Sequence, residues 1–163
     1  DNSASRNWEP LTHTIGYTTQ GLIECGSMLS DYKYIESAKL TLDRLLRKFE
    51  ISREMLAGRF DKNWNSTVNS VCITGCAQIS ICWQRLYEIY GDVRYLNASL
   101  KLNDKLKRQQ FFGGSELILG SLPSDYPLWG DYNPFIINSW GIKYFIDSLI
   151  LESRLISQIL NSR

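Results

Sequence analysis

Two stretches of the sequence, 61 residues apart, share one pattern and constrain the fold more than any other feature. SDYKYIESA and GDVRYLNAS align so that Asp31 matches Asp92 and Tyr34 matches Tyr95. Each stretch follows an apolar run rich in small residues and opens a second apolar run with helical spacing. The sequence therefore predicts one pair of helices that is used twice. In each pair we expect the Asp to cap the second helix and the Tyr to pack back on the first.

Hydrophobic spacing predicts an all-α chain whose helices are joined by polar or Gly-rich connections. The expected helices cover about 11–29, 34–50 and 71–90, with a return helix to about 110 and a last helix over 134–162. Pro134 suits the first turn of that last helix, which we expect to be deeply buried to about residue 151. A short helix over 52–57 and a short strand over 116–119 are further expectations.

Composition favours a single helical domain over residues 1–163, because 44% of the chain is hydrophobic and can form one core. Lys and Arg number 18 against 17 Asp and Glu, with no basic stripe, so no nucleic-acid partner is expected. No apolar run reaches the roughly 18 residues of a membrane span, so no membrane partner is expected either.

The four cysteines lie in apolar helical segments. Cys72 and Cys76 are four residues apart and could share a helix face, and the sequence has one histidine, His13. A zinc site would need more ligands in a closer pattern, so we interpret the cysteines as small core residues and expect no metal or cofactor. Reduced thiols suit a cytoplasmic location.

A repeat of about 60 residues fits either a superhelical solenoid or a closed α/α toroid, and tetratricopeptide-like solenoids would need a shorter period near 34. Small residues on the first helix of each pair, such as Gly16, Gly21 and Gly75, favour closely packed inner helices and therefore the toroid.

Several segments resemble the C-terminal part of a family of α/α-toroid proteins that occur with bacterial polysaccharide genes. These segments are HTIGYTTQGLIECG, GRFDKNW, CITGCAQISICWQRLYEIYGDVRYL and YPLWGDYNPFIINSWGIKYFIDSLILE. The family is similar to six-hairpin glycosidases and prenyltransferase-like toroids. It has TGNAQ where this chain has TGCAQ, so Cys76 replaces an Asn. A six-hairpin ring has more helices than this chain supplies, so the resemblance implies half a ring that is a fragment or pairs with another chain, including a second copy.

The resemblance implies a cavity at one end of the toroid, lined by loops and by the starts of the inner helices. Aromatic rings, amides, Arg and carboxylates at those positions suit an oligosaccharide ligand. The corresponding residues for substrate binding are Tyr17, Arg59, Trp64, Gln78, Tyr126, Trp129 and Tyr132, with Gln20 and Trp140 also at such positions. Alternatively, the Trp and Tyr side chains pack in the core or in the loops, and for Trp83 and Trp140 the core interpretation is favoured.

The candidate catalytic residues are Asp131, His13 and Asp61. Glycoside hydrolysis needs two carboxylates, for which Asp61, Asp131 and Glu24 are available, and His13 could serve as a general acid or base. The alternatives are a loop ion pair between Asp61 and Arg59, a turn role for Asp131 and a capping role for His13. The sequence thus supports two hypotheses: a protein that hydrolyses, lyses or epimerises a polysaccharide, or a non-catalytic helical module for binding and assembly.

Overall fold

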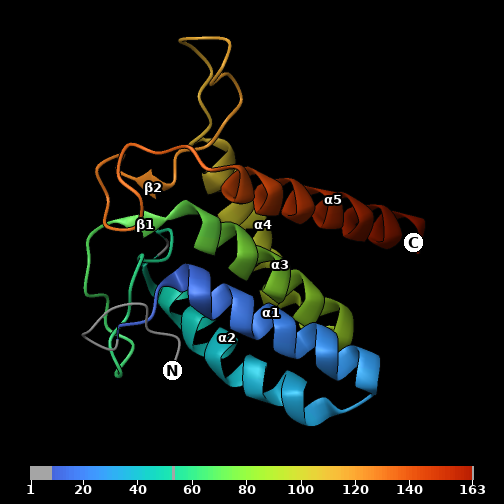
Figure 1. Ribbon diagram of the computed structural model, residues 1–163. Helices are drawn as coiled ribbons and strands as arrows, with labels where there is room; N and C mark the ends of the chain where they lie inside the picture. Colours follow the sequence, from blue (N-terminus) through green and yellow to red (C-terminus); the bar gives the residue numbers. More distant parts are fainter. Residues whose placement is uncertain (1–8, 53, 163) are drawn as a thin grey trace.

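The computed structural model describes residues 9–52 and 54–162, and within them the chain forms five α-helices and one small sheet (Figure 1). The helices are α1 (Thr12–Leu29), α2 (Tyr32–Ser52), α3 (Ile73–Tyr90), α4 (Val93–Lys107) and α5 (Ser139–Asn161). The strands β1 (Val71–Cys72) and β2 (Asp125–Tyr126) pair antiparallel, with Val71 opposite Tyr126. The prediction of a helical chain is confirmed, and the sheet was not predicted.

The two tight turns carry the aspartates of the repeated pattern. Asp31 accepts a hydrogen bond from the backbone N–H of Lys33 at 3.1 Å, and Asp92 accepts one from that of Arg94 at 3.0 Å. Gly91 ends α3 with a φ of 69°, which a residue without a Cβ adopts at little cost. Both predicted caps are therefore confirmed, and each satisfies a backbone N–H at a helix start.

The tyrosines of the repeated pattern differ from each other. Tyr95 is fully buried, but its hydroxyl donates to the Asp43 carboxylate of α2 rather than to the preceding helix. Tyr34 is exposed. The expectation that both tyrosines act alike is wrong, because Tyr95 faces α2 across the structure while Tyr34 lies on an outer surface.

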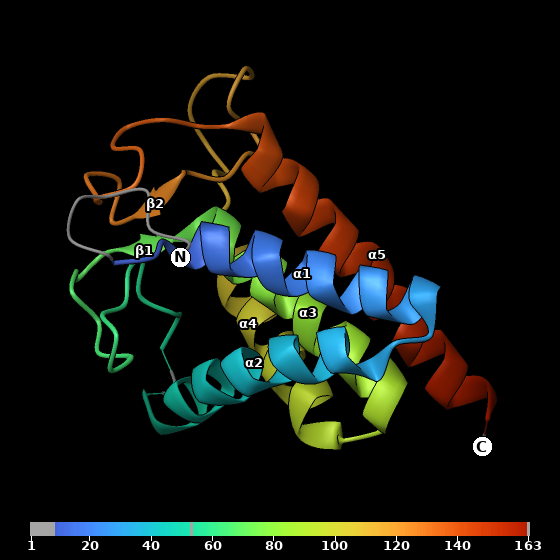
Figure 2. The ribbon, with the colours of Figure 1, turned by 60° about the horizontal axis from the view of Figure 1, so that its bottom comes forward.

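Helix α3 forms the centre of the structure and packs against α1, α4 and α5, while α2 packs mainly on α1 (Figures 1 and 2). Every residue from Ile73 to Gln84 is buried, because apolar and small side chains cover the whole circumference. Trp83 is fully buried, stacks near Phe49 and donates its indole N–H to the carbonyl of Leu42 at 3.2 Å. Its predicted core role is confirmed.

The last helix departs from prediction in its start and in its burial. It begins at Ser139 rather than at Pro134, because the Asn138 side chain caps it by accepting from the backbone N–H of Gly141 at 2.8 Å. Only Gly141, Phe145, Ser148 and Leu155 are buried, and Ile150 is 65% exposed. The predicted deep burial is wrong, since α5 packs on α3 and α4 with one face only.

Three smaller expectations are also corrected. A short helix was expected over 52–57. Instead, α2 continues to Ser52 and Ala57 forms a β-bridge with Val71. Residue 53 lies outside the described residues. Residues 116–119 form turns in place of a strand, and α4 ends at Lys107 instead of near 110.

The cysteines are free thiols. Cys72, Cys76 and Cys82 are buried as predicted, and burial raises the pKa of Cys76 and Cys82 to about 12. Cys25 is exposed, so its predicted core position is wrong. Among residues 9–52 and 54–162, no group of His, Cys, Asp and Glu is arranged to hold a metal ion. In the same part of the chain, no helix combines the length and apolar character of a membrane span.

Candidate functional site

Helices α1, α3 and α5 all begin at the end of the molecule that carries the sheet and the loops (Figure 1). Side chains from these three helices and from the loop before α5 contact one another there. The His13 ring lies 4.6 Å from the ring of Tyr17 and 5.4 Å from that of Tyr132, measured between centroids. The Tyr17 ring lies 5.5 Å from the ring of Tyr144. We call this group the His13 cluster; its members are His13, Tyr17, Gln78, Tyr132, Trp140 and Tyr144.

Close packing of two helix backbones brings His13 to its partner on α3. A Cβ added at Gly75 would lie 2.7 Å from the backbone nitrogen of His13, and one added at Gly16 would lie 2.7 Å from the Cβ of Gln78. Side chains at these positions would push α1 and α3 apart. With glycine at both, His13 Nδ1 lies 2.7 Å from the carboxamide oxygen of Gln78.

The hydrogen bond to Gln78 fixes the protonation pattern of His13. A carboxamide oxygen only accepts, so the imidazole carries its proton on Nδ1 and leaves the Nε2 lone pair available. Burial lowers the pKa of His13 below its usual 6.5, and the bond to Gln78 acts in the opposite direction. The imidazole is therefore neutral at pH 7, the state that a general base requires.

The other end of the Gln78 side chain faces Tyr144. Gln78 is fully buried, and its amide nitrogen forms no hydrogen bond of regular geometry with the described residues. Burial and the Tyr17 hydroxyl raise the pKa of Tyr144 to about 12, while the Gln78 carboxamide lowers it. A buried amide N–H whose hydrogen bonding is incomplete is costly, so this nitrogen is suited to a further acceptor that a ligand supplies.

Tyr132 faces His13 from the loop before α5. Its hydroxyl accepts a hydrogen bond from the indole N–H of Trp140 at 3.2 Å, which leaves its own proton free to donate. Burial raises the pKa of Tyr132, so the phenol is protonated at neutral pH. Trp140 is 45% exposed and its predicted core role is wrong, because it lies at the open face of α5.

The buried Asp125, which was not predicted as a site residue, holds the loop that carries Tyr132. Its carboxylate accepts hydrogen bonds from the backbone N–H groups of Tyr132 at 3.1 Å and Asn133 at 2.6 Å. The carboxylate also lies against Gly130, where an added Cβ would come within 2.6 Å of Asp125 Oδ1. Asp125 thus determines where Tyr132 points.

Arg59 and Asp131 form an ion pair next to the cluster. The guanidinium also donates to the carbonyl of Glu9 at 3.1 Å, and the backbone N–H of Asp131 donates to the Ser70 hydroxyl at 3.0 Å. The structure therefore pairs Arg59 with Asp131, and the loop ion pair considered for Arg59 and Asp61 is not formed.

Asp61 and Trp64 lie in a different hollow, of about 340 Å³, together with Thr18 and Leu22 of α1. Asp61 accepts from the backbone N–H groups of Asn63 and Asn65, both at 2.8 Å, and the bond from Asn65 lowers its pKa. The structure does not bring Asp61 together with His13.

The remaining sequence candidates are spread around this end of the chain. Tyr126 of β2 and Trp129 of the loop that follows are both exposed. Glu24 lies two turns or more along α1 from His13 and binds Arg85 at 2.9 Å. Tyr144 joins the cluster although sequence reasoning missed it, since its place within an apolar helix resembled a core position.

Comparison with known proteins finds no match: no family model, curated protein or solved structure corresponds to this chain.

Proposed function

We propose that the His13 cluster binds an acidic polysaccharide and acts on it by removing the proton next to the sugar carboxylate, by lysis or epimerisation. The observation that carries this proposal is the state of His13, a neutral imidazole held at Nδ1 by Gln78, with its ring centroid 5.4 Å from that of Tyr132. The resemblance to polysaccharide-associated toroids supports the same substrate class, and we propose that the helix pairs form part of such a toroid.

The chemical step uses His13 as base and Tyr132 as acid. His13 Nε2 takes the proton from the carbon that bears the carboxylate, and the electron pair of that C–H bond forms a C=C bond. The neighbouring C–O bond breaks, and the leaving oxygen takes the proton of the Tyr132 hydroxyl. In epimerisation the C–O bond stays intact, the electron pair moves onto the carboxylate as an enolate, and a proton from Tyr132 returns to the same carbon from the opposite face.

Hydrolysis fits the site less well. It needs two carboxyl groups that flank the glycosidic bond, about 5–10 Å apart. Asp131 is engaged by Arg59, Asp61 lies in a separate hollow, and the described residues of the His13 cluster include no carboxylate. The base His13 and the acid Tyr132 favour abstraction of a proton from a sugar carbon instead.

The surroundings of the cluster suit a charged sugar chain. Tyr17 is 48% exposed and Trp140 is 45% exposed, so each offers an aromatic face for sugar C–H groups. Arg59 and Lys143 are the nearby cations, each paired with a carboxylate, Asp131 and Asp147, and Lys143 Nζ also lies 4.5 Å above the ring of Tyr144. A carboxylate on the substrate would compete with Asp131 and Asp147 for these cations.

The test is an assay on uronate-containing polysaccharides, read by ultraviolet absorbance of the unsaturated product and by deuterium uptake from heavy water. We expect one of the two signals from the native chain, and its loss in His13→Ala and Tyr132→Phe. Tyr34→Phe, at an exposed tyrosine of α2 outside the cluster, is the matched control. A native chain with neither signal on any uronate polymer refutes the proposal.

The second candidate function is assembly with another chain through α5. Ile146 and Ile150 are one turn apart on this helix and are both exposed. Contiguous exposed apolar side chains mark interaction surfaces. Sedimentation tests it: the native chain should associate and Ile146→Lys should be monomeric, whereas a native monomer at all concentrations contradicts it.

A further inference from the structure

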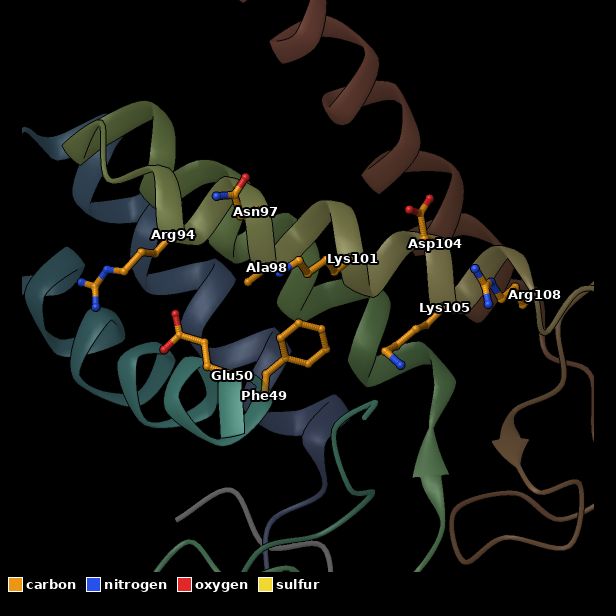
Figure 3. A pocket seen from close by; sticks show the side chains of 9 residues that line it. All are labelled: Phe49, Glu50, Arg94, Asn97, Ala98, Lys101, Asp104, Lys105 and Arg108. Atoms are coloured by element: carbon orange, nitrogen blue, oxygen red, sulfur yellow. The ribbon is translucent and has the colours of Figure 1, made fainter. Parts of the chain in front are cut away.

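A second hollow lies along α4 (Figure 3), and none of its lining residues belongs to the His13 cluster. It has a volume of about 660 Å³ and is bounded by the whole length of α4 and by the last turns of α2. Its lining residues are Phe49, Glu50, Arg94, Asn97, Ala98, Lys101, Asp104, Lys105 and Arg108. We call it the α2–α4 groove.

The wall that α4 contributes is cationic. Arg94, Lys101, Lys105 and Arg108 all face the groove, against two carboxylates, Glu50 and Asp104. Within the described chain, neither Lys101 nor Arg108 has an ion-pair partner. An excess of unpaired positive charge in one concave surface attracts a negatively charged ligand.

The floor of the groove is apolar. Phe49 and Ala98, each only 4% exposed, form it between the two helices. A ligand that fits must therefore combine negative charge at its edges with some apolar surface, and it must be long. From Arg94 to Arg108 the helix rises by about 21 Å, which an extended peptide of about six residues would span.

We infer that the α2–α4 groove docks an acidic segment of a partner protein. Carboxylates of the segment pair with Lys101 and Arg108 first, since these cations are unpaired, and the segment lies over the closely packed floor of Phe49 and Ala98. A polysaccharide fits less well, because the only aromatic ring in the lining is the buried Phe49 and offers no face for a sugar. This inference is independent of the function proposed for the His13 cluster.

The experiment measures binding of a fluorescently labelled peptide to the full chain by anisotropy. The probe has about eight residues, about six to span the groove and one more at each end, with Glu at most positions and two Leu. The comparison probes are the same peptide with Gln for Glu and a uronate oligosaccharide. We expect binding of the acidic peptide alone, weakened as added salt screens the charges.

Charge-reversal variants locate the binding. The double variant Lys101→Glu/Arg108→Glu should lower the affinity for the acidic peptide about tenfold or more, because two attractive charges become repulsive. The control Lys33→Glu/Arg44→Glu makes the same charge change at exposed positions of α2 outside the groove and should leave the affinity within about twofold. Circular dichroism checks that both variants are folded. Equal loss in both variants, no binding by the native chain, or binding of the oligosaccharide in place of the peptide would overturn the inference.

Discussion

Gly16 on α1 lies so close to Gln78 on α3 that a methyl group at Gly16 would come within 2.7 Å of the Gln78 Cβ and 3.0 Å of its carboxamide oxygen. That same oxygen binds His13 Nδ1. The close packing of α1 on α3 therefore also determines the position of His13, the proposed base.

Replacing Gly16 tests this coupling. Gly16→Ala should lower the free energy of unfolding by about 1–3 kcal/mol, because α1 and α3 must move apart. Gly21→Ala is the control on the same helix: nothing lies within 4 Å of its added Cβ, and it should stabilise the chain by about 0.5–1 kcal/mol. Chemical denaturation measures both. Equal effects of the two substitutions would contradict the close contact.

A buried polar network joins α3, α4 and α5. The carboxamide oxygen of Asn103 accepts from Ser80 at 2.7 Å and from Ser148 at 2.8 Å, and its nitrogen donates to Glu152 at 2.6 Å. Asn103→Ala should cost about 1–3 kcal/mol, because the buried hydroxyls lose their acceptor. Asn97→Ala, exposed on the same helix, should change stability by less than about 0.5 kcal/mol. Similar losses in the two variants would argue against the network.

Asp125 should control the position of Tyr132 without touching a substrate. Asp125→Ala removes the acceptor of the backbone N–H groups of Tyr132 and Asn133. The loop that carries Tyr132 should therefore become more mobile, and the rate of proton abstraction should fall. Fluorescence of Trp140, which donates to Tyr132, should shift in the same variant. Asp61→Ala is the control, since Asp61 caps a separate loop. An unchanged loop and activity in Asp125→Ala would refute this role.

His13 should make the stability of the fold depend on pH. Its folded pKa lies below the 6.5 of an unperturbed imidazole, so the unfolded state binds a proton first as the pH falls. The contribution of His13 to stability is complete above pH 6.5 and is lost as the pH falls through the lower folded value. His13→Gln should therefore flatten the fall in unfolding free energy between neutral and mildly acidic pH. If the unfolding free energy of His13→Gln fell with pH as steeply as that of the native chain, the lowered pKa of His13 would be contradicted.

The helices were predictable from sequence because each depends on local signals. The spacing of apolar residues located α1 to α4, and Asp31 and Asp92 marked the starts of α2 and α4. Pro134 misled the prediction for α5, since Asn138 a turn later provides the actual cap. The sheet of β1 and β2 joins residues more than fifty positions apart, and no local pattern reports such a pairing.

Part of the candidate site was also predictable. His13, Tyr17, Gln78 and Tyr132 were expected at helix starts and loops, and the structure brings them together. Tyr144 and Asp125 were missed, because a Tyr inside an apolar helix and an Asp before Tyr-Pro look like packing and turn residues. Their roles depend on tertiary contacts with Tyr17 and with the backbone of Tyr132.

The proposed chemistry depends most directly on the state of His13, the one histidine of the chain, and nitrogen NMR of isotopically labelled protein reads that state. We predict a neutral ring at pH 7, protonated on Nδ1, with a pKa below 6.5 and a changed tautomer balance in Gln78→Ala. A positively charged ring at neutral pH, or a ring protonated on Nε2 alone, would contradict the account.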